Sequence, residues 1–144
     1  MVGKPSQGGE PTSRLGADRI RPAGAATGRK VGAVEQYTGN DFYCDIAIPR
    51  RQPVEVVHED EHVLAFEHTR PHWPEHIVVV PKTHIASLLE LTDGDLTLKL
   101  LAVVRQISDE LLRRTGAAAV TTNLGAYQDS KHLHFHIHSG RALR

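Results

Sequence analysis

Histidine is the residue whose arrangement in this sequence first suggests chemistry. The chain has ten histidines, and four of them alternate with apolar residues over 132–138, which reads His-Leu-His-Phe-His-Ile-His. Strand side chains alternate between two faces, so a strand here places four imidazoles on one side, roughly 6.5–7 Å apart, and the apolar residues on the other. A neutral imidazole can act as a base or attack phosphorus while its neighbour donates a proton. The row therefore suits a small anionic group such as a phosphate.

A surface role and a metal-binding role for the row compete with this one. A solvated surface stripe is the first, but lysine or glutamate serves solubility better than four aligned imidazoles. A metal site is the second, because histidine is the commonest metal ligand. Such a site needs a third or fourth ligand from elsewhere, and no carboxylate or cysteine stands at a recognised spacing. We therefore prefer the phosphate-directed role and expect no metal and no other cofactor.

The overall composition excludes several classes of function. The 144 residues include 17 basic and 17 acidic side chains and a single cysteine, Cys44. A formal net charge of zero disfavours nucleic acid and anionic membranes as partners. One cysteine cannot form an internal disulfide, and no apolar run reaches the roughly 20 residues of a membrane span or forms a secretory signal. We expect a soluble, cytoplasmic protein.

The sequence divides into a tail and one domain. Residues 1–40 contain eight of the twelve glycines and show neither helical nor strand periodicity. Composition of this kind is typical of a flexible segment, whereas the remaining residues are enough for one core. We predict a flexible tail over 1–40 and a single domain over 41–144.

Three apolar stretches open the predicted domain. Val54–Val57 and Val63–Phe66 flank the acidic polar segment 58–62, a pattern that indicates a hairpin. His76–Pro81 is continuously apolar after its first residue, as expected for a strand buried on both faces. We place that strand at the centre of the sheet.

Helices and two further strands complete the domain. We predict a short helix over 83–90 and a longer one that Thr92-Asp93 can cap, with apolar residues every three or four positions and an end at Gly116. Strands are predicted over 118–124 and 133–137. The order of elements, without a repeating βαβ unit, predicts an α+β fold with a mainly antiparallel sheet of about five strands, one long helix and one short helix.

Two separate motifs resemble one known family. The histidine row resembles the His-φ-His-φ-His-φ-φ signature of the histidine triad (HIT) superfamily of nucleotide hydrolases and transferases, where φ is apolar. The residues leading into the row, and the segment 66–85 with its Pro-Lys-Thr-His-Ile end, resemble the same family. The resemblance covers about 41–141 and implies a HIT-like fold and a homodimer.

Four histidines allow two triads, one beginning at His132 and the other at His134. Gln128 and Lys131 fall at family positions only for the first, which we adopt. The resemblance then implies that His134 attacks the α-phosphate and forms a covalent nucleotidyl-histidine intermediate. It also implies that His132 orients His134 through a backbone or ring hydrogen bond, and that His136 binds phosphate oxygens.

The resemblance also implies a set of substrate-binding residues. His76 matches a distant family histidine that supports the triad, and His68 stands where the family usually has Asp or Asn to hold the ribose hydroxyls. Some members bind structural zinc through Cys-x-x-Cys, but the corresponding residues here read Asp-Phe-Tyr-Cys over 41–44, so zinc is not expected. The predicted substrate-binding residues are His68, His76, Asn123, Gln128 and Lys131.

The implied function is that of an enzyme acting at the α-phosphate of a nucleotide, on a nucleoside phosphoramidate or dinucleoside polyphosphate. Two alternatives stay open. One is a nucleotidyltransferase or phosphorylase of the same fold. The other is a nucleotide-binding module with little turnover, suggested by His68 and Asp129 at positions where the family has other residues. The expected partners are a small-molecule nucleotide and a second copy of the chain.

Overall fold

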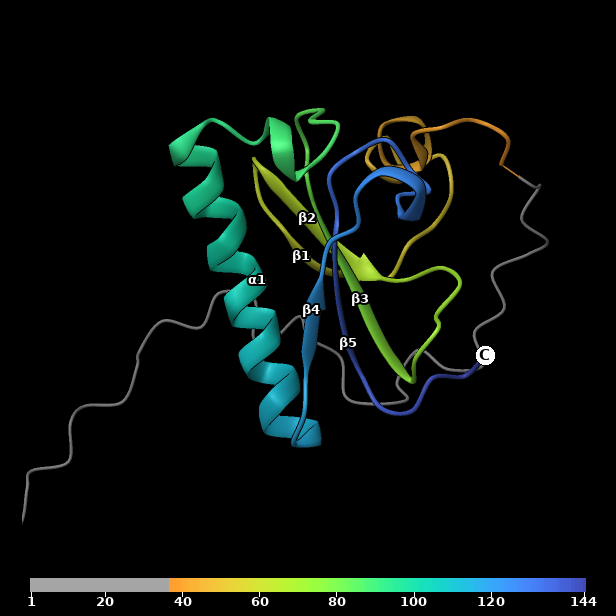
Figure 1. The fold of residues 1–144 in the computed structure, drawn as a ribbon, viewed down its shortest axis with the longest axis vertical. Helices are drawn as coiled ribbons and strands as arrows, with labels where there is room; N and C mark the ends of the chain where they lie inside the picture. The colour runs from red at the N-terminus through yellow and green to blue at the C-terminus, as the bar shows by residue number, and fades with distance from the viewer. Residues whose placement is uncertain (1–36) are drawn as a thin grey trace, which may run out of the picture.

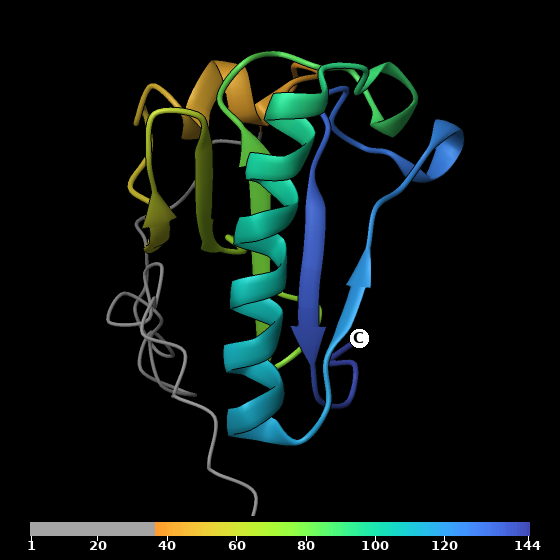
Figure 2. The same ribbon diagram turned by 90° about the vertical axis from the view of Figure 1, so that its left-hand side faces the viewer.

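One antiparallel sheet and one long helix form the body of the protein (Figures 1 and 2). The structure, a computed structural model, describes residues 37–144. The five described strands are arranged in the order β1-β2-β3-β5-β4, and every neighbouring pair is antiparallel. The predicted α+β class and the strand number are confirmed. The predicted tail over 1–40 lies outside the described residues except for its last four positions.

The predicted hairpin consists of β1 (Val56–Glu59) and β2 (Val63–Glu67). The acidic turn between them is held by Asp60, whose Oδ1 accepts hydrogen bonds from the backbone N–H groups of His62 (2.7 Å) and Val63 (2.8 Å). A short carboxylate that satisfies turn N–H groups in this way explains why an acidic segment separates two apolar strands.

The strand predicted to be central, β3 (Glu75–Pro81), is third of the five. All of its residues after Glu75 are buried, as expected for a strand that is covered on both faces.

The long helix α1 (Gly94–Thr115) begins and ends at the predicted residues. Oδ1 of Asp93 accepts from the backbone N–H groups of Asp95 and Leu96, and Gly116 ends the helix at a φ of 84°, a left-handed conformation that favours glycine. One face of the helix packs on the sheet (Figure 2). The core on this side contains Val57, Val63, Ala65, Ile77, Val79, Leu100, Val103, Val104, Ile107, Leu111, Leu133, Phe135 and Ile137.

The predicted short helix over 83–90 is reduced to a single 3-10 turn, η3 (Leu88–Glu90). The carbonyls of Ile85 and Ala86, which a helix would use internally, instead accept from the Leu133 N–H (2.6 Å) and from Nε2 of Gln128 (2.6 Å). Tertiary hydrogen bonds therefore replace the local ones.

A π-helical segment that the sequence pattern did not predict, η2 (Tyr43–Ala47), covers the sheet on the side away from α1 (Figure 1). The N–H of Ile48 donates to the carbonyl of Tyr43 at 2.9 Å, the five-residue spacing of a π turn. Tyr43 and Ala47 pack with Leu64, Phe66, Val78 and Val80 in a second core.

The last two strands differ from the predicted ranges. β4 (Ala119–Thr121) is shorter than 118–124, and β5 (Phe135–Ser139) begins two residues later than predicted. The β5 ladder with β3 extends only from the Phe135 and Val79 pair to the Ser139 and Glu75 pair. His132 and His134 therefore precede the paired part of the strand. Within the described residues, no helix is long and apolar enough to cross a membrane.

Replacing Leu100 with alanine is expected to destabilise the domain by about 2–5 kcal/mol, because this fully buried side chain leaves a cavity between α1 and the sheet. Urea unfolding followed by circular dichroism measures the change. Leu98 on the same helix is 72% exposed and is the matched control, for which Leu98→Ala should change stability by no more than about 0.5 kcal/mol. Equal effects of the two substitutions would contradict the assigned packing face.

Candidate active site

A cavity of about 1220 Å³ lies on the face of the sheet that α1 does not cover. Its walls include His76 from β3, His136 and His138 from β5, and His134 just before β5. The apolar residues that alternate with these histidines pack in the core beneath α1. As predicted, the imidazoles of His134, His136 and His138 and the apolar side chains between them lie on opposite faces of the strand. The cavity that the imidazoles line is large enough for a nucleotide.

His134 presents an unprotonated ring nitrogen to this cavity. Its Nδ1 lies 2.7 Å from the carbonyl oxygen of His132, and because a carbonyl only accepts, Nδ1 carries the hydrogen. The lone pair is then on Nε2. Burial is the main cause of a lowered pKa for His134, so the ring is neutral at pH 7, and its face packs near Tyr43 with ring centroids 4.9 Å apart. A neutral, fixed tautomer of this kind is poised for nucleophilic attack.

His136 has the opposite tautomer, which is set by a chain of hydrogen bonds through His76. The backbone N–H of His72 donates to Nδ1 of His76 (3.1 Å), so His76 carries its hydrogen on Nε2. That Nε2–H donates to Nδ1 of His136 (2.9 Å), which leaves the hydrogen of His136 on its Nε2. Burial, followed by neighbouring histidines, lowers the pKa of His76 to about 2 and that of His136 to about 3. His136 is therefore a neutral hydrogen-bond donor.

His68 also lines the cavity and stacks on His76, with ring centroids 4.2 Å apart and an interplanar angle of 17°. Its Nδ1 accepts from the backbone N–H of Arg70 (3.0 Å), so its hydrogen is on Nε2. Burial, followed by nearby charges, lowers its pKa to about 4. His68 therefore offers an N–H donor at the position where the family that the sequence resembles usually has an oxygen acceptor.

The free energy of unfolding is expected to fall as the pH drops below 6.5. Unfolded histidine titrates near 6.5, whereas the folded pKa values of His68, His76 and His136 are about 4, 2 and 3. Below pH 6.5 the unfolded chain binds more protons, so the stability that is complete above pH 6.5 is lost toward pH 4. The slope is up to about 1.4 kcal/mol per pH unit for each ring, and less where solvent reaches it.

Urea unfolding between pH 7.5 and 5 measures this slope. His68→Gln should reduce it by removing one of the titrating rings. A free energy of unfolding that stays constant across the interval would contradict the three lowered pKa values.

His132 departs from the predicted row. It is fully buried and does not line the cavity. Its Nε2–H donates to the carbonyl of Pro81 (2.8 Å), while its own carbonyl accepts from Nδ1–H of His134. Of the backbone and ring hydrogen bonds that the family resemblance left open, this is the backbone one. His132 therefore lies outside the cavity, which the other three imidazoles of the row line.

The other predicted binding residues fall in two places. Asn123 lines the cavity. Gln128 and Lys131 are not among its lining residues: Nε2 of Gln128 donates to the Ala86 carbonyl, and Nζ of Lys131 donates to the Gln128 carbonyl at 2.7 Å. The latter two hold together the loop that leads into the histidine row.

Sequence reasoning missed the aromatic residues of the cavity, among them Tyr43 and Trp73. Trp73 stacks on His138, with ring centroids 3.6 Å apart and an interplanar angle of 13°. Trp73 is the only tryptophan of the sequence and stands between His72 and Pro74. This local sequence could have indicated that Trp73 belongs to the site. Tyr43 gave no signal, because its segment has no regular period.

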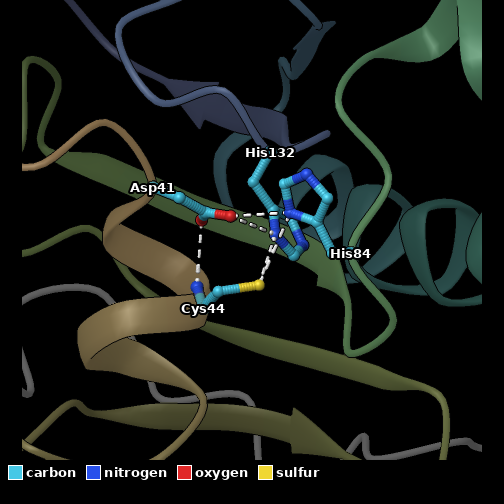
Figure 3. A group of neighbouring side chains, drawn as sticks. All are labelled: Asp41, Cys44, His84 and His132. Carbon is cyan, nitrogen blue, oxygen red and sulfur yellow. Dashed lines mark hydrogen bonds and ion pairs between the residues drawn. The ribbon is translucent and has the colours of Figure 1, made fainter.

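A second group of polar side chains, Asp41, Cys44 and His84, gathers around His132 (Figure 3). Nδ1 of His132 is 3.3 Å from Sγ of Cys44 and 3.3 Å from Oδ2 of Asp41, and Nδ1 of His84 is 2.7 Å from the same Oδ2. Burial, followed by the Asp41 carboxylate, raises the pKa of the Cys44 thiol to about 11. Thiolate, imidazole and carboxylate are all donors that zinc binds in proteins, so these side chains fit such an ion.

Comparison of the sequence with known proteins identifies the same family that the histidine row resembles. A family model described as "Scavenger mRNA decapping enzyme C-term binding" matches residues 40–142. An uncharacterised HIT-like protein of Synechococcus elongatus is 37% identical over 102 residues, which are 67% of this chain and 87% of the relative.

Solved structures give the same result. A histidine triad protein from Clostridium difficile matches with a TM-score of 0.61 at 33% identity, over 76% of this chain and 97% of the other. A HIT family hydrolase from Legionella pneumophila matches with a TM-score of 0.62 at 28% identity, over 73% and 96%. With His134 and His136 in the cavity, and with these relatives in both sequence and structure, the chain belongs to the histidine triad family.

Proposed function

We propose that the protein is an enzyme that cleaves a nucleotide at its α-phosphate through a covalent nucleotidyl-histidine intermediate. The observation that carries this proposal is the pair of opposite tautomers at His134 and His136. One ring presents a lone pair and the next presents an N–H, with ring centroids 4.8 Å apart. A phosphate between them would meet a nucleophile and a hydrogen-bond donor.

The proposed first step is attack of His134 Nε2 on the α-phosphorus. A P–N bond forms, the bond from phosphorus to the leaving group breaks, and the leaving group departs with the electron pair. The Nε2–H of His136 donates to a non-bridging oxygen, where negative charge grows in the transition state. The His132 carbonyl holds Nδ1–H of His134 as the imidazole becomes cationic.

In the proposed second step, water attacks the same phosphorus and the P–N bond to His134 breaks. The nucleoside monophosphate leaves, the water proton passes to solvent, and the imidazole returns to its neutral tautomer. Phosphate or a sugar phosphate in place of water would give the transferase alternative.

The tautomers also support the triad that begins at His132. If the triad began at His134, His136 would be the nucleophile. Its Nδ1 accepts from His76, however, so the neutral ring has a hydrogen on the nitrogen that would have to attack.

A nucleotide-binding module with little turnover is the second candidate. Asp129 lines the cavity, where a carboxylate would repel a departing phosphate.

An assay of the purified chain against adenosine and guanosine phosphoramidates, dinucleoside polyphosphates and sugar nucleotides, with and without added phosphate, separates these functions. We expect hydrolysis of a phosphoramidate or dinucleoside polyphosphate without added phosphate. Turnover that requires phosphate would indicate a phosphorylase, and nucleotide binding without turnover would indicate the binding module.

We also propose a homodimer, as the family resemblance implies, in the cytoplasm. Within the described sheet β4 is an edge strand, and Val120 on it and Leu101 on α1 are 45% and 40% exposed. Exposed apolar side chains beside a free sheet edge favour association of two copies. Sedimentation velocity measures the oligomeric state.

A further inference from the structure

The turn that begins at Asp41 aims two potential metal ligands at one point. Oδ1 of Asp41 accepts from the backbone N–H of Cys44 (3.0 Å), which fixes the carboxylate and leaves Oδ2 free to face the histidines. Oδ2 is 2.7 Å from Nδ1 of His84 and 3.3 Å from Nδ1 of His132. Figure 3 shows the sulfur of Cys44 directed at the same two rings.

The ring of His132 has the orientation of a metal ligand. Its Nε2–H donates to the carbonyl of Pro81, so Nδ1 carries a lone pair directed at the sulfur of Cys44 and the carboxylate of Asp41. In the metal-free chain the Cys44 thiol can donate its hydrogen to this lone pair, and a bound cation would replace that hydrogen. Metal-binding histidines usually donate their second ring N–H to a carbonyl or carboxylate, as His132 does.

The distances between these donors fit a tetrahedral zinc site. With Zn–N near 2.05 Å, Zn–O near 2.1 Å and Zn–S near 2.3 Å, tetrahedral angles require N···S edges of about 3.6 Å and N···O edges of about 3.4 Å. The two N···S distances are 3.3 and 3.5 Å, and one N···O distance is 3.3 Å. The remaining edge, His84 to Asp41, is 2.7 Å, the length of a direct hydrogen bond that an ion would replace.

We propose that Asp41, Cys44, His84 and His132 bind one zinc ion, with the Asp41 carboxylate as a ligand in place of a second thiolate. One thiolate, one carboxylate and two neutral imidazoles balance the charge of a divalent ion, and a set that includes sulfur favours zinc over calcium or magnesium. The side chain of His84 is 52% exposed, so an ion can reach the site. Four protein ligands leave no open position, which makes the role structural.

The inference goes beyond the proposed function and does not depend on it. The absence of zinc expected from the sequence rested on the missing first cysteine of a Cys-x-x-Cys pair, and Asp41 stands at that position. The site would tie the start of η2 and the residues just before it to the loop after β3 and to the approach to β5. It thereby stabilises the position of His132, whose carbonyl orients His134.

A second group of possible ligands, His68, His76 and His136, is a poorer zinc site. Nδ1 of His68 and Nδ1 of His76 accept backbone N–H groups, so the Nε2 atoms that face the group carry hydrogens. A metal there would force both rings out of their fixed tautomers. The group serves as an internal comparison for the experiment.

The test is metal content, visible spectroscopy and thermal unfolding of the full chain, measured apart from any enzymatic activity. Elemental analysis of protein purified without chelator should give about one zinc per chain. The Co²⁺-substituted protein should show the intense visible bands of a tetrahedral site together with thiolate-to-cobalt charge transfer. Chelation should lower the melting temperature, and adding back Zn²⁺ should restore it.

Three variants identify the ligands: His84→Ala, Cys44→Ser and Asp41→Asn, of which the last keeps the oxygen that accepts the Cys44 N–H. An outer-shell partner is worth 10–100-fold in metal affinity, so loss of a direct ligand should weaken Co²⁺ binding by at least about 100-fold. The charge-transfer band should disappear in Cys44→Ser. The control His62→Ala removes another partly exposed histidine, outside both groups, and should bind metal as the unmodified chain does.

The His84→Ala variant is expected to fold, because the His84 side chain is exposed and its replacement opens no cavity in the core. Stoichiometric zinc that is lost in folded His84→Ala would support the site. Three results would overturn it: no zinc bound by the unmodified chain, zinc retained in His84→Ala but lost in His68→Ala, or Co²⁺ spectra unchanged in Cys44→Ser.

Discussion

Replacing His134 with alanine is expected to reduce turnover by about 10³-fold or more while nucleotide binding and folding persist. The substitution removes the ring whose Nε2 lone pair attacks phosphorus. It also removes the Nδ1–H that the His132 carbonyl accepts, so this carbonyl no longer contributes to catalysis. Nucleotide contacts elsewhere in the cavity remain. The measurements are kcat on the best substrate of the panel, calorimetric binding of a nucleoside monophosphate, and the melting temperature.

His62→Ala is the control for His134→Ala, because His62 lies on the surface outside the cavity. It should keep kcat within about twofold of the unmodified chain. Unchanged activity of His134→Ala would refute the mechanism. Equal loss of activity and of melting temperature would instead indicate a structural role for this ring.

Replacing His136 with alanine is expected to lower kcat by about 10²–10³-fold, the usual effect of losing a donor to transition-state charge. The loss should fall mainly on kcat, because the Nε2–H of His136 meets an oxygen whose charge grows during the reaction. Steady-state kinetics of the folded variant separates kcat from KM.

His138→Ala is the matched control, since His138 lies two residues further along β5 and also lines the cavity. Its ring stacks on Trp73, and its replacement should cost no more than a few-fold in kcat. The opposite result, a severe loss in His138→Ala with a mild effect in His132→Ala, would move the triad two residues along and make His136 the nucleophile.

Local patterns predicted those parts of the structure that local forces determine. The Asp93 cap and the Gly116 end of α1 were predictable because capping needs a side-chain acceptor at one end and a residue tolerant of positive φ at the other. The placement of His134, His136 and His138 on one face was predictable because strand side chains alternate.

Contacts between distant parts of the chain were not predictable from those patterns. His132 is 91 residues from Asp41 and 88 from Cys44, and the spacing of residues 41–44 does not indicate that a distant histidine lies beside them. The tautomers of His134 and His136 were likewise unpredictable, because they depend on the His132 carbonyl and on a ring from the neighbouring strand. The sequence indicated which residues could act, and the fold indicated which nitrogen of each ring is available.

The covalent intermediate provides the most direct test of the proposed mechanism. Enzyme mixed with a slowly turned-over substrate and quenched rapidly is analysed by intact mass spectrometry and peptide mapping. The mechanism predicts a mass increase of one nucleotidyl group on the peptide that contains the histidine row, located by fragmentation on His134 and absent from the His134→Ala protein. A nucleotidyl group on His136, or single-turnover product formation with no covalent adduct at any time point, would contradict it.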